Sequence, residues 1–85
     1  MAEEDSKKYA EWLKEAIAEA KKGLEEGGIP IGSALVNRES GEVISRGRNM
    51  LVQNGDPTAH AEIVAVKNAG RRTDWEKMAL VTTLR

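Results

Sequence analysis

The apolar residues of the chain change their spacing at Gly27 and Gly28. Before these glycines they recur every three or four residues over 6–26, which predicts an amphipathic helix with one buried face. After them, a short apolar run over 31–37 ends in turn-forming residues and predicts a buried strand. The glycines between suit a helix end, where a left-handed backbone is common. The buried face is predicted to comprise Tyr9, Trp12, Leu13, Ala16, Ile17, Ala20 and Leu24.

The remaining segments complete the order helix, strand, strand, helix, strand. A hairpin loop over 38–41 leads to a second strand over 42–46, with Gly41 where a positive φ is expected. Residues 47–57 are predicted to form a long loop, which in a domain this small is more often functional than idle. A second helix is predicted over 58–69, capped by Asp56 or Thr58, and a third strand over 79–84. We expect the third strand to run parallel to the first through a right-handed crossover.

Composition excludes several classes of protein. Eighty-five residues make one domain at most. No apolar stretch approaches the roughly 20 residues of a membrane span. The absence of cysteine excludes a disulfide scaffold and any thiolate metal ligand within the chain. A net charge of −1 argues against a nucleic-acid partner, and a start without signal-peptide features indicates a cytoplasmic protein.

The predicted third strand runs almost to the last residue, Arg85. Such a strand would leave one sheet edge without a partner. We therefore expect residues 1–85 to be the N-terminal part of a single larger α/β domain, completed by a second chain or fragment.

The one histidine of the chain, His60, lies two residues before Glu62 at the start of the second predicted helix. By itself a histidine in this position is more typical of a surface or packing residue than of a metal ligand. Alternate helix residues point about 200° apart, so the two side chains cannot share one helix face. They can still flank one point at the helix tip, where the positive end of the helix dipole favours a bound hydroxide.

Several motifs, in this order, resemble the zinc-dependent cytidine and cytosine deaminase superfamily, and most of all its free-base cytosine deaminase branch. They are Glu-Gly-Gly-Ile-Pro-Ile-Gly-Ser at 26–33, Gly-Arg-Asn at 47–49, Asp-Pro-Thr-Ala-His-Ala-Glu at 56–62, Asn-Ala-Gly-Arg at 68–71 and Thr-Thr-Leu at 82–84. The resemblance covers about residues 9–84 and implies an α/β three-layer sandwich with a helix on each face of the sheet. The second signature of the family, Pro-Cys-x-x-Cys, is absent from the chain.

The resemblance implies hydrolytic deamination of cytosine to uracil and ammonia. His60 would be one ligand of a Zn²⁺ ion, and two cysteines of a complementary C-terminal fragment would supply further ligands. Glu62 would shuttle protons between the zinc-bound water and the base. Asn49 and the backbone N–H of Ala61 would bind the base, and Ile31 would line its pocket. From the residues alone, Asn49 is equally well explained as a turn residue that closes the loop.

On this interpretation the chain is inactive alone, takes a free pyrimidine base once complemented, and assembles as a homo- or heterodimer. One alternative is a deaminase fragment for another base or for a tRNA adenosine, which the 56–62 motif suits as well. Another is a non-catalytic, designed binding or assembly module derived from the deaminase fold, which the missing ligands and the Lys/Glu-rich first helix favour. Two residues depart from the family pattern: Arg48 stands where histidine is frequent, and Arg85 where a small or uncharged residue is more common.

Overall fold

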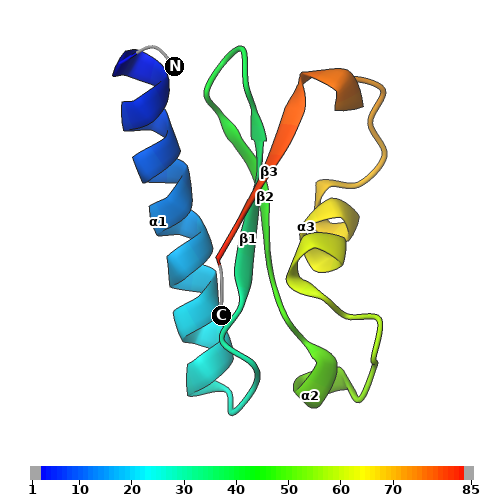
Figure 1. Ribbon diagram of the computed structural model, residues 1–85. Helices are drawn as coiled ribbons and strands as arrows, with labels where there is room; N and C mark the ends of the chain where they lie inside the picture. Colours follow the sequence, from blue (N-terminus) through cyan, green and yellow to red (C-terminus); the bar gives the residue numbers. More distant parts are fainter. Residues whose placement is uncertain (1–2, 84–85) are drawn as a thin grey trace.

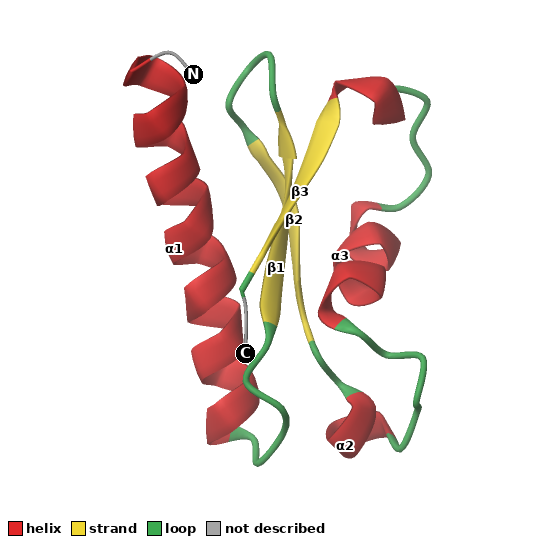
Figure 2. Ribbon diagram, in the orientation of Figure 1, coloured by secondary structure: helices red, strands yellow, loops and turns green. Residues whose placement is uncertain are grey.

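The computed structural model describes residues 3–83, with side chains from residue 8 onward. Three layers make up the fold (Figure 1): helix α1 (Glu3–Glu25) covers one face of a sheet, and helix α3 (Ala61–Ala69) covers the other. The sheet contains β1 (Gly32–Asn37), β2 (Val43–Arg48) and β3 (Met78–Thr82), as Figure 2 shows. The predicted α/β class and the order of its main elements are therefore confirmed.

The strand order is β2-β1-β3, and β1 is antiparallel to both of its neighbours. The predicted hairpin of β1 and β2 is present, and Gly41 in its loop has a φ of 78°. The prediction that β3 runs parallel to β1 is wrong. The crossover through α3 starts from β2, so β3 runs in the direction of β2, and β1 lies between these two strands in the opposite direction.

Several predicted boundaries also differ from the structure. The first helix ends at Glu25, one residue earlier than predicted, and the second strand extends to Arg48. The predicted loop 47–57 contains a short helix, α2 (Leu51–Asn54), and the second long helix begins at Ala61 rather than at residue 58. A 3-10 turn, η1 (Trp75–Lys77), precedes β3. The third strand ends at Thr82 rather than at residue 84, because Thr83 is already outside the strand; residue 84 itself lies outside the described residues.

The core is small and largely aliphatic. Ala34 and Val36 of β1 and Val81 of β3 are buried together, with Trp12 and Leu13 of α1 packed against them. Five of the six residues of β1 are buried, as expected for a central strand covered on both faces.

The predicted buried face of α1 is only partly buried. Ala16 and Ala20 are buried, whereas Tyr9, Ile17 and Leu24 are exposed, Leu24 to 60%. The apolar stripe of α1 is wider than the three-stranded sheet beneath it. The side chains at these three positions therefore extend past the sheet and are left exposed. In the part of the chain that the structure describes, no helix is both long and apolar enough to cross a membrane.

Candidate active site

The five residues that the sequence assigned to a site line one pocket of about 240 Å³. They converge from separate segments: Ile31 precedes β1, Asn49 follows β2, and the other three lie at the start of α3. The pocket is lined by Ile31, Asn49, His60, Ala61, Glu62, Thr82 and Thr83. The roles given to these residues remain predictions, but their convergence is a property of the fold.

The pocket lies where β1 begins and where β2 and β3 end. The backbone N–H of Asn49 donates to the carbonyl oxygen of Ile31 over 3.0 Å, which joins the two segments. On the other side of β1, the N–H of Thr83 donates to the Gly32 carbonyl over 2.9 Å, and the Gly32 N–H donates to the Thr83 hydroxyl over 3.0 Å. Three chain segments are thereby held side by side at one end of the sheet.

Asn49 is 3% exposed, and the oxygen and the nitrogen of its side-chain amide have different roles. Its Oδ1 accepts a hydrogen bond from the Leu51 N–H over 3.0 Å, which makes Asn49 the turn residue that starts α2. Among the described residues, its Nδ2 has no hydrogen-bond partner. A ligand in the pocket therefore meets the amide of Asn49 as a donor and has to present an acceptor to it.

His60 and Glu62 lie at the N-terminus of α3. His60 is the N-cap residue, with an extended backbone (φ −71°, ψ 151°) and an exposed side chain, and Glu62 is half-buried in the first turn. Although the two side chains are two positions apart, both line the pocket.

The helix begins later than predicted because its expected cap is used elsewhere. Asp56 Oδ1 accepts hydrogen bonds from the backbone N–H and the hydroxyl of Thr58, over 2.9 and 2.7 Å. These bonds form a separate turn and lower the pKa of Asp56.

Helix α3 approaches β2 closely enough to bring its tip to the pocket. A Cβ atom on Gly47 would overlap the backbone N of Ala65 and lie 2.5 Å from the Ala61 carbonyl oxygen. Ser45 lies two residues before Gly47 and therefore on the same face of β2. Its hydroxyl donates to the Ala65 carbonyl over 2.6 Å. These two small residues set the spacing between helix and strand.

A cluster of charged residues lies behind the pocket, on the α1 side of the sheet. The guanidinium of Arg48 donates to both carboxylate oxygens of Glu26 over 2.9 and 2.8 Å, and to Glu19 over 3.3 Å. Gln53 in α2 also donates to Glu26 over 2.9 Å. The hydrogen bonds from Arg48 and then Gln53 lower the pKa of Glu26 from its usual 4.5 to about 2.

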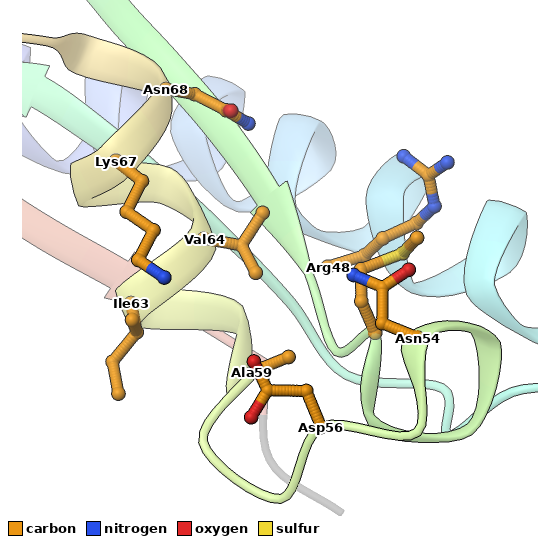
Figure 3. A pocket seen from close by; sticks show the side chains of 9 residues that line it. Arg48, Asn54, Asp56, Ala59, Ile63, Val64, Lys67 and Asn68 are labelled. Carbon is orange, nitrogen blue, oxygen red and sulfur yellow. The ribbon is translucent and has the colours of Figure 1, made fainter.

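Arg48 also borders a second pocket, of about 330 Å³, between α2 and α3. Figure 3 shows its side chain extending away from α3, toward α1, while Lys67 and Asp56 line the opposite part of the pocket.

Two groups of residues at the site were missed as functional residues. Thr82 and Thr83 belong to a motif that carried the resemblance, but their position at the pocket depends on the pairing of β3 with β1. The cluster of Arg48 with Glu19 and Glu26 had no local signal, because Arg48 is 22 positions from Glu26 and 29 from Glu19 in the sequence.

The residues of the chain fit a zinc ion only in part. A catalytic zinc site needs three protein ligands and an open position. His60 offers an accessible imidazole at the pocket, but the chain contains no cysteine and no second histidine. Among the side chains that the structure describes, those of residues 8–83, no group of three or more metal-ligating residues comes together. The described residues therefore do not form a complete zinc site.

The three-layer fold and the His-Ala-Glu pocket together define a deaminase-like domain. Residues 6–85 match the family model of the cytidine and deoxycytidylate deaminase zinc-binding region. The chain belongs to this family.

Its relatives act on different bases according to their names. The chain is 46% identical over 61 residues to a tRNA-specific adenosine deaminase of Aquifex aeolicus, covering 72% of this chain and 39% of that protein. It is 41% identical over 59 residues to a cytosine deaminase of Candida albicans, covering 69% of this chain and 39% of that one. The aligned part of the chain thus spans about 39% of the length of these curated relatives.

Solved structures agree on the fold. A structure from work on A-to-I editing by tRNA:A34 deaminases has a TM-score of 0.74 at 31% identity, over 87% of this chain and 58% of that one. The guanine deaminase of Bacillus subtilis has a TM-score of 0.69 at 30% identity, over 96% of this chain and 50% of that one.

Proposed function

We propose that this chain supplies the His-Ala-Glu half of a zinc-dependent enzyme that hydrolytically deaminates a nucleobase, with cytosine as its substrate. The observation that supports the proposal is the convergence of His60, Glu62, Asn49, Ala61 and Ile31 on one pocket. An imidazole, a carboxylate and an amide donor are the groups needed to hold a metal, move a proton and bind the edge of a base.

Each residue has a separate task in this proposal. Zinc, when bound, supplies a water that is acidic enough to attack near neutral pH. Glu62 carries protons to the ring nitrogen of the base and to its departing amine. The Nδ2 of Asn49 donates to an acceptor on the base, the backbone N–H of Ala61 holds the same ligand, and Ile31 packs against the ring.

The remaining zinc ligands have to come from outside these residues. We propose that they are two cysteines in a Pro-Cys-x-x-Cys segment, supplied by the same polypeptide or by a partner chain. The assembled protein is defined here as the present chain together with that segment and the zinc ion. The chain alone is proposed to be inactive.

A tRNA adenosine is the second candidate substrate. It is favoured by the identity of 46% with the tRNA-specific adenosine deaminase of Aquifex aeolicus, and by the tRNA deaminase structure with a TM-score of 0.74. Against it, the net charge of −1 offers little general attraction for a polyanion. Both substrates share the chemistry at the site, which is the loss of an exocyclic amine from an amidine.

Ammonia release from cytosine and from adenosine in tRNA tests the proposal in the assembled protein. We expect turnover of cytosine, and a Glu62→Gln variant that keeps its zinc but is about 10²–10⁴-fold slower. His60→Ala should lose zinc and activity together. Turnover of tRNA adenosine alone would replace cytosine as the substrate, and a protein that binds no zinc and deaminates neither would be a non-catalytic module.

A further inference from the structure

We propose that Arg48 is a positioning residue, which fixes the base-binding wall of the pocket by clamping its supporting segments to Glu26 and Glu19. That wall consists of Ile31 and Asn49. The inference rests on the proposed function only for the identity of the ligand as a nucleobase.

The clamp has the geometry of a strong interaction. Two nitrogens of Arg48 meet the two oxygens of Glu26 at 2.9 and 2.8 Å, and a bidentate arrangement of this kind fixes orientation as well as distance. The third nitrogen reaches Glu19, whose side chain is only 7% exposed. Lys22 lies 3.2 Å from the other oxygen of Glu19, so this buried carboxylate has a cation on each side.

The three segments that support the wall meet at the contacts between Arg48 and Glu26. Arg48 ends β2 and directly precedes Asn49, whose N–H binds the Ile31 carbonyl. Glu26 follows α1 and opens the segment that leads to Ile31. Gln53 belongs to α2, which starts at the hydrogen bond between Asn49 Oδ1 and Leu51, and Gln53 donates to Glu26.

The two glycines after Glu26 differ in how closely they are packed. Gly27 has a φ of 79°, and a Cβ atom there would meet nothing within 4 Å. The segment from Glu26 to Ile31 thus has open space at Gly27, whereas a Cβ atom on Gly28 would lie 2.5 Å from Nε2 of Gln53, the side chain that donates to Glu26. This segment is joined to the end of β2 by the hydrogen bond from Asn49 to the Ile31 carbonyl and by the polar contacts of Glu26, two of which come from Arg48.

The chain contains a matched pair for comparison. Arg46 and Glu15 also join β2 to α1, with Nε and Oε2 2.8 Å apart. Arg46 lies two residues before Arg48, but this pair touches neither Gln53 nor Glu26, and it is 43% and 38% exposed. It therefore shares the general task of holding α1 to the sheet without contacting the segments of the wall.

The test compares Arg48→Met with Arg46→Met in the assembled protein. We expect Arg48→Met to raise KM for the base about tenfold, because small misplacements of a binding group are costly, while kcat changes much less. Zinc content should stay at that of the parent. Hydrogen exchange at the backbone amides of Asn49 and Leu51 should be faster in Arg48→Met and unchanged in Arg46→Met.

Two further variants keep the test decisive. Glu26→Gln should reproduce the effects of Arg48→Met, and the double variant should add little to either, because both remove one interaction. Arg48→Lys keeps the positive charge but cannot make the two parallel hydrogen bonds of the guanidinium to Glu26. Its KM should therefore lie between those of the parent and Arg48→Met, and this variant still tests the proposal if Arg48→Met fails to fold.

Equal KM values and equal exchange rates in Arg48→Met and Arg46→Met would overturn the inference. Failure of the proposed function is a different result: the parent would bind no zinc and deaminate no base. In that case the exchange rates at Asn49 and Leu51 would still decide whether Arg48 holds the wall.

Discussion

Gly47 of β2 lies directly against the backbone of Ala65 in α3, with no room for a Cβ atom between strand and helix. The obstruction is backbone, which cannot rotate away as a long side chain can. Because α3 carries His60 and Glu62 at its first turn, this contact sets how far the two residues stand from Asn49.

A Gly47→Ala substitution should therefore push α3 away from the sheet. We expect a loss of about 3 kcal/mol in the free energy of unfolding, at the upper end for overpacking. Gly55→Ala is the matched control, since Gly55 has a φ of 64° but open space around its Cβ position. It should cost about 1 kcal/mol through backbone strain alone. Equal losses in urea unfolding would contradict the packing argument.

The stability contributed by Glu26 should depend on pH. Its folded pKa of about 2 lies below the usual 4.5, so its stabilising contribution is complete above pH 4.5 and is lost as the pH falls toward 2. We expect the parent to be more stable than Glu26→Gln at pH 7, and the difference to shrink across this interval. In an Arg48→Met background the same substitution should have a smaller pH-dependent effect, because of the two hydrogen-bond donors only Gln53 is left to lower the pKa of Glu26. A difference that stays constant from pH 7 to pH 2 would show that the hydrogen bonds do not bias ionisation.

Asn49→Asp separates the two tasks of this side chain. The carboxylate keeps an oxygen for the Leu51 N–H, so the turn into α2 should be retained. It replaces the donor at the pocket by an acceptor, and a base that presents an acceptor should bind about 10–100-fold more weakly. Asn49→Ala removes both groups and should also lower stability. Undiminished binding of the base by Asn49→Asp in titration calorimetry would place the donor elsewhere.

The parts of this fold that could be predicted are those with local signals. The spacing of apolar residues in α1, the apolar run over 31–37 and the turn at Gly41 each identify an element from its own residues. The grouping of Asn49, His60 and Glu62 came from motifs rather than from periodicity. The direction of β3 was predicted wrongly, because the crossover through α3 was referred to β1. The strand that precedes α3 is β2, so β3 runs parallel to β2 and antiparallel to β1.

The buried carboxylate of Glu19 could not be predicted from the local sequence either. Glu19 occupies a buried position on α1 only because Arg48, 29 residues later, and Lys22 compensate it. Its sequence neighbours suggest an ordinary solvated glutamate. Leu24 illustrates the converse, since it fits the apolar stripe of α1 but lies beyond the narrow sheet and is exposed.

The attachment of β3 to β1 offers a test in which the double variant should be more stable than one of the singles. Ser33, which is fully buried, donates its hydroxyl proton to Thr82 Oγ1 over 2.9 Å, and Thr82 donates to the Gly32 carbonyl over 3.2 Å. Thr82→Val leaves the buried Ser33 hydroxyl without its partner and should cost about 2 kcal/mol. Ser33→Ala leaves Thr82 its bond to Gly32 and should cost about 1 kcal/mol. Replacing both partners by apolar groups removes the unsatisfied hydroxyl, so Ser33→Ala combined with Thr82→Val should lose less than Thr82→Val alone. Additive losses in equilibrium unfolding would mean that the two hydroxyls stabilise the strand pair independently.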